Sequence, residues 1–597
     1  MRWRHRVGAA VGALVLTTAA AVPAQADGEP APHDDNGKTA TARGHGGAVA
    51  TVDRDATEAG MQVLRSGGNA VDAAVAAAAA LGVTEPYSSG FGGGGYFVYY
   101  SAEEGRIHTL DGRETAPAAM AEDSFLEGGE PIPFAEAVTS GLSVGAPGTP
   151  ATWEQAVERW GNRPLRTVMN PAIRLAERGF IVDQTFHDQT AANAERFADF
   201  PATAELFLPG GAPPAVGTRL RNRDLATTYR EFARHGTGVL SSGIGADIAA
   251  TAADPPVRPG ATRTVRPGLL TQADVSGYEV VAQEPTRVSY RGLDVYSMAP
   301  SSSGGSTVGE ALNILTALDP DPADSARLQH HTLEASKLAY ADRNAYVGDP
   351  AFVDVPLDTL LSDEFAAQRA CLVDDASVLP APAAPGDLDG SGECTPAAPQ
   401  QAGEHEGPST THLVTSDRWG NVVSYTLTIE QTGGSGITVP GRGFILNNEL
   451  TDFEFEVAPS GAGAANLPAP GKRPRSSMAP AIVLSDGAPF LALGTPGGAT
   501  IITTVLHLLV DRIDRGLTLP EALAAPRLSQ RNAATTQAEP AFFGTPEEKE
   551  LSALGHQFTS TPEIGAAAAL EFLPDGGVLA AAEAERRGGG HAAVQLP

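Results

Sequence analysis

The stretch Pro408-Ser409-Thr410-Thr411-His412-Leu413-Val414-Thr415-Ser416 decides the fold of this chain, because it leads from a long polar segment directly into a β-strand pattern. A turn-rich break, Asp417 to Asn421 (DRWGN), separates this strand from a second β-prone run, Val422 to Ile429 (VVSYTLTI). The two runs therefore predict a hairpin. If the strands pair symmetrically about the turn, Thr410 lies opposite Thr428 on one face of the sheet, and two hydroxyl groups meet at one end of the hairpin.

Thr410 is a candidate N-terminal nucleophile. A threonine hydroxyl is weak at its own pKa, and one way to activate it is to use its own free α-amine, with an unperturbed pKa of about 7.7 to 8.0, as the general base. This role requires a cut before Thr410. The segment from about Ala376 to Ser409 is rich in Ala, Pro, Gly and acidic residues, offers little that could pack, and could move away after the cut. On the local pattern alone, the simpler interpretation is that Thr410 only begins an ordinary strand.

A set of motifs in a fixed order extends this pattern to most of the chain. They are GNAVDAAVAAAAALGVTEPYSSGFGGGGYFVYY (68–100), LDGRETAP (110–117), APSSSGG (299–305), LEASKLAYADRNAYVGDP (333–350), STTHLVTSDRWGNVVSYTLTIEQ (409–431), GFILNNELTDF (443–453), KRPRSSMAPAIV (472–483) and GTPGGATIITTVL (494–506). From about Gly47 to its C-terminus the chain thus resembles the γ-glutamyltranspeptidases, which belong to the N-terminal nucleophile hydrolases. The resemblance implies self-cleavage between Ser409 and Thr410, with Thr410 as the nucleophile of the mature enzyme.

Helix and strand patterns favour the fold that the resemblance implies. Helical stretches are predicted at about 55–66, 70–81, 328–344 and 500–515, and strands at 96–100 and 107–111, with Gly67 and Gly68 as a helix stop and Asn69 as an N-cap. This mixture of predicted helices and strands fits an α/β (α+β) fold, a four-layer αββα sandwich in which two central sheets are covered by helices. The glycine run 92–95 precedes a strand and lacks a following Gly-Lys-Ser/Thr, so it indicates close backbone approach in a sheet instead of a phosphate-binding loop.

The N-terminal 26 residues are typical of a secretory signal peptide, with Arg2, Arg4 and Arg6 before an apolar stretch and an A-x-A site at 24–26. Residues 27–45 are polar and predicted to be disordered. We expect residues 46–409 to form a large subunit that ends in a flexible spacer, and residues 410–597 to form a small one. No later segment is long and apolar enough for a transmembrane helix, so a secreted, soluble protein is expected.

The two cysteines, Cys371 and Cys394, lie in or beside the spacer. In an oxidising compartment they are expected to form one disulfide, worth roughly 3 kcal/mol in the chain-entropy model, with two free thiols as the alternative. No histidine at metal-site spacing accompanies them.

Composition narrows the classes of partner. The chain has 597 residues, 42 % of them hydrophobic, and a formal charge of −30, which becomes −33 once the three arginines of the leader are removed. So acidic a surface argues against nucleic acid and anionic membranes as partners.

The resemblance also assigns a substrate pocket. A γ-glutamyl group carries an α-carboxylate and an α-ammonium. Arg113 would grip the carboxylate in two places, helped by the serine pair Ser476 and Ser477. Three acidic residues would surround the ammonium: Glu430, Glu449 and Asp452.

Two departures from common family patterns concern this pocket. Some members carry Asn at the position of Glu430 and Gln at that of Glu449, and Leu is frequent at that of Arg475. Because like charges raise one another's pKa values, we expect weaker substrate binding below about pH 5. Arg475 is expected to add a cation beside the carboxylate pocket, with an effect whose sign the sequence does not give.

The remaining chemistry comes from backbone and hydroxyl groups. Gly497 and Gly498 match the pair whose N–H groups bind the oxyanion, and losing one such donor typically costs about 3 kcal/mol of barrier. Thr428 would orient the nucleophile and its amine. His412 lies on the same strand face as Thr410 but has no acidic partner in view, so we interpret it as structural. No metal or cofactor is expected.

The sequence therefore predicts a secreted γ-glutamyltransferase or glutathione hydrolase, whose donors are small γ-glutamyl compounds and whose acceptors are water, amino acids or peptides. The spacer between Asp452 and the serine pair lacks a longer aromatic insert found in some members, so an open cleft that admits γ-linked peptides or polyglutamate is expected. Two alternatives stay open. One is an acylase of the same fold that acts on glutaryl side chains, and the other is a γ-glutamyl-compound binder that never matures.

Overall fold

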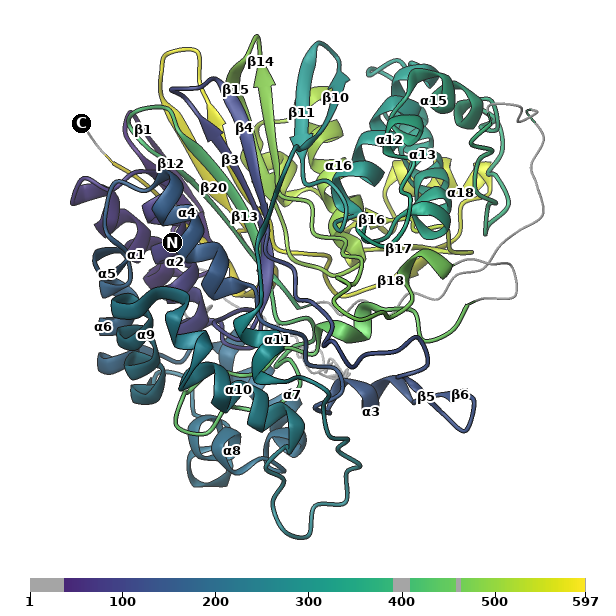
Figure 1. Ribbon diagram of the computed structural model, residues 1–597. Helices are drawn as coiled ribbons and strands as arrows, with labels where there is room; N and C mark the ends of the chain where they lie inside the picture. Colours follow the sequence, from purple (N-terminus) through teal and green to yellow (C-terminus); the bar gives the residue numbers. More distant parts are fainter. Residues whose placement is uncertain (1–36, 390–393, 395–408, 458–462, 596–597) are drawn as a thin grey trace, which may run out of the picture. The chain divides into compact units, whose positions relative to one another are not determined.

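Two seven-stranded antiparallel sheets form the centre of the protein (Figure 1). The computed structural model describes residues 37–389, 394, 409–457 and 463–595. The predicted signal peptide, residues 27–36 of the predicted disordered segment and most of the second half of the spacer lie outside the described residues.

The first sheet, called the hairpin sheet here, contains the pattern around Thr410. Its strands in spatial order are β21 (His591–Val594), β2 (Ala48–Thr51), β12 (Thr411–Ser416), β13 (Val422–Thr428), β3 (Gly94–Ser101), β4 (Arg106–Asp111) and β9 (Val281–Gln283). The second sheet has the order β1 (Thr41–Gly44), β20 (Val578–Ala582), β19 (Ala568–Phe572), β15 (Ala488–Gly494), β14 (Ala481–Ser485), β11 (Leu293–Ser297) and β10 (Thr286–Tyr290).

The two sheets pack face to face through small and branched apolar side chains. Ala50, Val98 and Val414 of the hairpin sheet meet Ile482 and Leu570 of the second sheet in one buried cluster. Along each strand, side chains point alternately toward the other sheet and away from it. Each sheet therefore has an outer face, which helices can cover.

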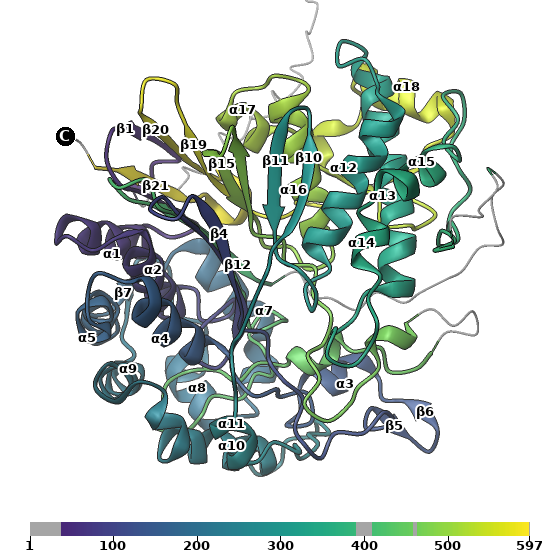
Figure 2. The same cartoon turned by 45° about the horizontal axis from the view of Figure 1, so that its top comes forward.

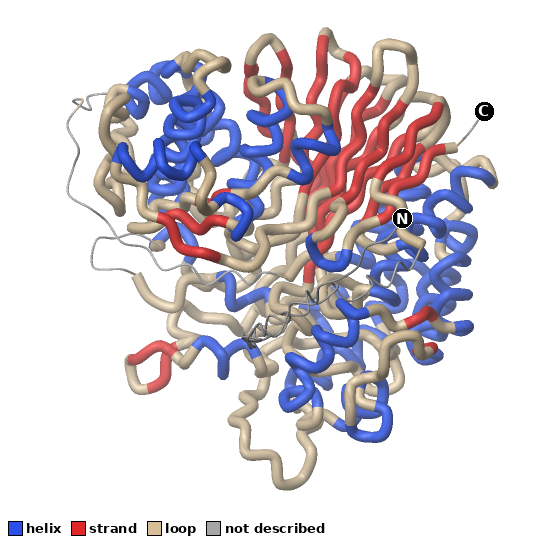
Figure 3. Tube along the Cα trace, turned by 180° about the vertical axis from the view of Figure 1, so that it is seen from behind, coloured by secondary structure: helices blue, strands red, loops and turns tan. Residues whose placement is uncertain are grey.

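Helices cover both outer faces, as the view from behind in Figure 3 also shows. Beside the hairpin sheet lie α1 (Arg54–Arg65), α2 (Ala70–Thr84), α4 (Thr149–Trp160), α5 (Leu165–Val168), α6 (Asn170–Arg178), α7 (Gln184–Phe197), α8 (Pro201–Phe207), α9 (Arg223–His235) and α10 (Ile244–Ala253), with the short α11 (Gln272–Ser276) near them. The short α3 (Phe134–Val138) belongs to a separate apolar cluster with Phe125 and Phe453. Beside the second sheet lie α12 (Gly304–Leu318), α13 (Ser325–Tyr346), α14 (Leu357–Leu360), α15 (Asp363–Ala370), α16 (Thr500–Ile513), α17 (Leu519–Ala524) and α18 (Pro546–Leu554), which the tilted view separates (Figure 2). The predicted four-layer αββα sandwich is confirmed.

Three small sheets lie outside the two large ones. They are β5 (Leu126–Glu127) with β6 (Glu130–Pro131), β7 (Phe180–Ile181) with β8 (Arg219–Leu220), and β16 (Leu528–Ser529), β17 (Thr536–Ala538) and β18 (Phe558–Ser560) together. A search of the described residues finds no helix long and apolar enough to cross a membrane.

The predicted hairpin has the predicted register. Thr411 pairs with Leu427 and Ser416 with Val422, so the strands are symmetric about the turn. Asp417 holds that turn, because its carboxylate accepts hydrogen bonds from the N–H groups of Trp419 and Asn421.

Local signals near the N-terminus are also confirmed. Asn69 caps α2, and it exchanges hydrogen bonds with Asp72 in a reciprocal capping box. The glycine run serves close approach: a Cβ on Gly93 would lie 2.0 Å from the carbonyl oxygen of Thr428, so any larger residue would push this end of β13 out of place.

Two predictions of disorder are wrong where the structure describes the residues. Residues 41–44 form β1, which pairs with β20 and so adds a strand to the second sheet. The first part of the spacer is docked: Leu379, Ala383 and Ala384 are buried, and Ala383 and Asn532 exchange two hydrogen bonds. Main-chain hydrogen bonds and small apolar side chains hold this segment, which its Pro- and Ala-rich composition conceals.

The structure contains the expected disulfide. Cys371, at the end of α15, is bonded to Cys394 across a Cα–Cα distance of 5.4 Å. The bond therefore ties the spacer to the helical layer on the second sheet.

Candidate active site

The open end of the β12–β13 hairpin lines a small cavity, and most of the predicted site residues meet there. Its lining comprises Arg113, Ser409, Thr410, Thr428, Glu430, Glu449, Asp452, Ser476, Ser477, Met478, Gly498 and Ile501. The free volume is about 10 Å³, roughly the space that one water molecule needs. Both residues of the proposed cleavage site, Ser409 and Thr410, line this cavity.

Thr410 lies against the peptide bond that precedes it. Its hydroxyl is within hydrogen-bonding distance of the Ser409 carbonyl oxygen and lies 3.1 Å from the hydroxyl oxygen of Thr428. Thr428 donates to the same Ser409 carbonyl at 3.2 Å and accepts the N–H of Glu430 at 2.9 Å. The pairing predicted from the hairpin thus brings both hydroxyls to the carbonyl of the proposed cleavage site.

Residues on both sides of this peptide bond are held from other parts of the fold. The Ser409 hydroxyl donates to the Tyr87 carbonyl oxygen at 3.0 Å. Arg587 donates to the carbonyl oxygen of Thr410 at 2.6 Å and forms an ion pair with Glu85 at 2.8 Å. Sequence reasoning missed Arg587, because it lies near the C-terminus outside every motif that was recognised.

Arg113 is part of a buried ion network, which the sequence did not indicate. It follows β4, its side chain is 1 % exposed, and it pairs with the carboxylates of Glu449 and Asp452 on a 3₁₀ turn at Glu449–Asp452. It also donates to the carbonyl oxygens of Pro474, at 3.1 Å, and Arg475, at 2.9 Å. Burial alone would lower the pKa of Arg113, but the charges of Glu449 and Asp452 raise it well above its usual value, so the guanidinium stays charged.

Glu114, beside Arg113, is a second residue that the sequence reasoning left without a role. It is fully buried, and neither carboxylate oxygen has a hydrogen-bond partner among the described residues. Burial raises the pKa of Glu114 well above its usual range, and the negative charge of Glu449 raises it further, so this group keeps its proton. A neutral Glu114 limits the negative charge around Arg113.

Glu430 occupies a backbone conformation that favours other residues. Its φ is +77°, in the left-handed region where Asn is better tolerated than Glu. Its carboxylate accepts hydrogen bonds from Asn448 and, at 3.5 Å, from Thr451, so the side chain is fixed in the cavity wall. The departure from the common Asn at this position thus adds a carboxylate at the cost of some backbone strain.

The serine pair is positioned by α13 and by the APSSSGG motif. Arg343 donates to the hydroxyl of Ser477 at 2.9 Å, and Ser303 donates to the carbonyl oxygen of Ser476 at 2.7 Å. Arg475 is not among the residues that line the cavity; its side chain forms an ion pair with Glu454 at 3.2 Å, and its carbonyl oxygen accepts a hydrogen bond from Arg113. The effect of this extra cation beside the carboxylate pocket stays a prediction.

Gly497 and Gly498 connect β15 to α16 with their N–H groups free. Among the described residues, neither N–H group donates a hydrogen bond. Gly498 has a φ of +56° and lines the same cavity as Thr410. Free N–H donors just before a helix N-terminus suit a negatively charged oxygen.

His412 lies inside the hairpin sheet. Its Nδ1 is 2.8 Å from the hydroxyl oxygen of Thr426, and a Cβ on Gly494 would collide with its ring. Burial lowers the pKa of His412 to about 3. The residue is thus a neutral packed side chain, which agrees with the structural role predicted for it.

His412 should make the fold sensitive to acid. Since its folded-state pKa is below the unfolded value of about 6.5, its contribution to stability is complete above that pH and is lost as the pH falls toward 3. Between pH 7 and pH 5 the free energy of unfolding should fall by about 2 kcal/mol because of His412. Thermal melting of His412→Gln at several pH values should show a smaller acid-induced loss of stability than the parent shows. The exposed His235→Gln serves as a control, and an unchanged pH dependence in His412→Gln would contradict the assignment.

The fold and the site together define the class of protein. An antiparallel αββα sandwich, with a buried threonine at the start of a central strand, is the arrangement of the N-terminal nucleophile hydrolases. The sequence model described as "Gamma-glutamyltranspeptidase" matches residues 56–594, and the chain belongs to that family.

Similar proteins include both hydrolases and acylases. A glutathione hydrolase proenzyme of Bacillus subtilis strain 168 is 36 % identical over 592 residues, which is 98 % of this chain and 97 % of that protein. An Acylase ACY 1 proenzyme of Pseudomonas sp. strain V22 is 35 % identical over 91 % of this chain and 92 % of its own. The crystal structure of a cephalosporin acylase from Bacillus halodurans is similar with a TM-score of 0.81 and 28 % identity, over 96 % of this chain and 100 % of that one.

Proposed function

We propose that this chain is the precursor of a γ-glutamyltransferase and glutathione hydrolase that cuts itself between Ser409 and Thr410. The observation that carries the proposal is the contact of the Thr410 hydroxyl with both Thr428 and the Ser409 carbonyl oxygen. This contact lies in a cavity that also presents a guanidinium, three carboxylates and two serines.

Self-cleavage follows from the position of the nucleophile. The Thr410 hydroxyl oxygen bonds to the Ser409 carbonyl carbon, the peptide C–N bond breaks, and the hydroxyl proton passes to the released Thr410 nitrogen. Water then hydrolyses the resulting ester, which leaves a Ser409 carboxylate and restores the Thr410 hydroxyl. Thr428, which contacts both oxygens involved, is the residue best placed to orient this step.

Turnover uses the same hydroxyl with a new base. Once Thr410 is N-terminal, its α-amine takes the hydroxyl proton as the oxygen attacks the γ-carbonyl of the donor. The negative charge that develops on the carbonyl oxygen is stabilised by the N–H groups of Gly497 and Gly498. The amine product leaves with a proton, and water or an amino-acid amine then takes the glutamyl group from Thr410.

Charge in the cavity selects the donor. Arg113 with Ser476 and Ser477 supports recognition of the α-carboxylate, while Glu430, Glu449 and Asp452 support recognition of the α-ammonium. All three acids also have partners within the protein: Glu449 and Asp452 pair with Arg113, and Glu430 accepts hydrogen bonds from the side chains of Gln431, Asn448 and Thr451.

The acylase-type relatives make glutaryl side chains the alternative substrate, and a pair of substrates separates the two functions. γ-Glutamyl-p-nitroanilide and glutaryl-p-nitroanilide have the same length but differ in the α-amine. We expect kcat/KM to be at least about 100-fold higher for the γ-glutamyl compound, because the glutaryl compound leaves a buried carboxylate without its partner.

Glu430→Gln provides the matched variant for this comparison, since it keeps the shape and removes the charge. The preference for the γ-glutamyl compound should shrink in this variant while cleavage at Thr410 continues. Equal or faster release from the glutaryl compound by the parent enzyme would assign the protein to the acylases. An uncut, inactive parent chain would favour the binding-protein alternative.

Bulky donors should also be accepted. The described cavity lining includes no residue between Asp452 and Ser476, and Phe455 of that segment instead stacks on Phe125 at 4.4 Å. We therefore expect glutamate release from γ-linked polyglutamate at a rate within about tenfold of that from a small γ-glutamyl donor at matched saturation. Release from the small donor alone would show that something closes over the site.

Export and a two-chain organisation complete the proposal. The leader pattern of residues 1–26 and the Cys371–Cys394 disulfide support passage to an oxidising compartment. The large subunit of residues 46–409 and the small subunit of residues 410–597 are expected to remain associated, because β12 and β13 lie between β2 and β3 in the hairpin sheet.

A further inference from the structure

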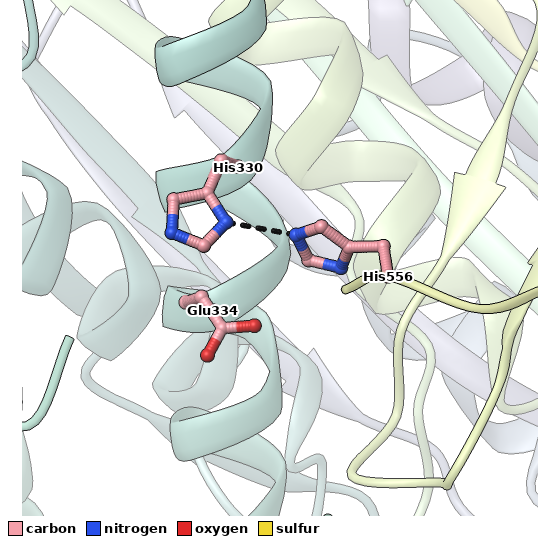
Figure 4. A group of neighbouring side chains, drawn as sticks. All are labelled: His330, Glu334 and His556. Carbon is pink, nitrogen blue, oxygen red and sulfur yellow. Dashed lines mark hydrogen bonds between the residues drawn. The ribbon is translucent and has the colours of Figure 1, made fainter. Parts of the chain in front are cut away.

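A second cluster of chemically capable side chains lies apart from the Thr410 cavity. His330 and Glu334 are one turn apart on α13 and face the same way, and His556 approaches them from the segment after α18 (Figure 4). All three are buried, and one possible ligand atom from each lies within 4.8 Å of the other two. None of them lines the cavity described above.

The surroundings fix how the His330 ring is oriented. Its Nε2 is 2.9 Å from the carbonyl oxygen of Asp374, which can only accept a hydrogen bond, so this nitrogen carries the proton. The lone pair on Nδ1 is then directed at Nε2 of His556, 2.8 Å away. A ring nitrogen bonded to a backbone carbonyl, with the other nitrogen directed inward, is the usual arrangement of a metal-bound histidine.

Glu334 could act as a third metal ligand without losing its present hydrogen-bond partners. One of its carboxylate oxygens accepts from Lys337 at 2.7 Å and the other from the N–H of Leu379 at 2.9 Å. A carboxylate offers about four lone-pair positions, so two remain. The nearby ammonium of Lys337 will weaken the attraction for a cation, which leads us to expect weaker binding than in all-cysteine structural sites.

We propose that His330, Glu334 and His556 bind a divalent transition metal, with Zn²⁺ the best match. Two imidazole nitrogens and one carboxylate oxygen suit Zn²⁺ and exclude Ca²⁺ and Mg²⁺, which prefer oxygen ligands. Tetrahedral ligands at about 2.1 Å from the ion lie about 3.4 Å apart. The present ligand atoms lie within 4.8 Å of one another, so each of these separations has to change by no more than about 1.4 Å. The hydrogen bond between the two rings is replaced, and His556 adopts the tautomer with its proton on Nδ1.

The ion would have a structural role. His330 and Glu334 precede the proposed cleavage site, and His556 follows it, so an ion here joins the two mature chains; this consequence alone depends on the proposed function. The neighbours Asp374 and Leu379 belong to the docked start of the spacer. The ion would therefore also stabilise the segment that leads to the cleavage site.

Titration with Zn²⁺ and with Co²⁺ tests the site directly. We expect saturable binding of one ion per chain, a visible absorption band of tetrahedral Co²⁺, and a Zn²⁺-dependent rise in Tm. His330→Gln and His556→Gln should each weaken binding by at least about tenfold, because Gln keeps a hydrogen-bonding group but is a poor ligand for Zn²⁺. His331→Gln is the matched control on the same helix: its ring lies 5.6 Å from that of His330, but its Nε2 pairs with Asp375 and it is not part of the cluster.

The titration is run on both the wild-type protein and the uncut Thr410→Ala chain, so its result does not depend on self-cleavage. Circular dichroism confirms that each variant is folded before titration. Binding that disappears in the His330 and His556 variants and persists in His331→Gln supports the proposal. Failure of the folded parent to bind either ion, or equal binding by the His556→Gln variant, overturns it.

Discussion

Thr410→Ala should leave the protein as one uncut chain without measurable turnover. The substitution removes the Thr410 hydroxyl, which lies against the Ser409 carbonyl group and is also the proposed nucleophile for the donor. Loss of a catalytic nucleophile lowers kcat by about a million-fold in a comparable hydrolase. Denaturing, reducing mass spectrometry should show two wild-type chains that begin at about Asp27 and at Thr410, and one chain for the variant.

Two variants make this result specific to the Thr410 hydroxyl. Thr410→Ser keeps a hydroxyl and should still be cut, although with altered kinetics. Thr411→Val removes the hydroxyl of the next residue, which is buried and has no hydrogen-bond partner among the described residues, and should be cut normally. Cleavage of Thr410→Ala at the same position would show that another group attacks the Ser409 carbonyl.

Arg113→Ala should damage both catalysis and stability. Its removal breaks the buried ion pairs with Glu449 and Asp452, and breaking a buried pair by removing one partner typically costs about 3–5 kcal/mol of folding free energy. The substrate carboxylate loses its cation at the same time, so we expect kcat/KM to fall at least about 100-fold, mainly through KM. Arg113→Lys should recover part of the stability but little of the binding, because an ammonium cannot reproduce the fork of a guanidinium.

Unfolding in urea gives the stability part of this test, and initial rates with γ-glutamyl-p-nitroanilide give the catalytic part. Unfolding is best measured in the Thr410→Ala background, where each sample is a single chain. Arg106→Ala is the control, since Arg106 is half exposed and pairs only at the surface with Glu284. A normal KM in a folded Arg113→Ala enzyme would remove Arg113 from the substrate site.

The sequence predicts those features of the site and fold that depend on residues close together in the chain. The Thr410–Thr428 pairing depends only on the alternation of side chains along two strands and on a five-residue turn, and the structure contains both. The Asn69 cap follows from a reciprocal bond between residues three apart. Positions such as Glu430 and Gly498 came from resemblance, and the cavity places both beside Thr410.

What the sequence could not supply are contacts between distant segments. The pairing of Arg113 with Glu449 and Asp452 joins β4 to a turn more than 300 residues later. The docked spacer was missed because its hydrogen bonds are made by backbone groups, as in the contact of Leu379 with Glu334. The partners of Arg475 could not be read from the sequence either: its side chain pairs with Glu454, and its carbonyl oxygen accepts from Arg113.

The most direct test of Thr410 as the nucleophile is the intact mass of the C-terminal chain after acid quenching during turnover of a γ-glutamyl donor. We predict a chain that begins at Thr410 and, in a fraction of the molecules, is heavier by one glutamyl group. A peptide digest should place the added mass on the Thr410 hydroxyl. A C-terminal chain that stays unmodified during measurable turnover, or a glutamyl group on another residue, would contradict it.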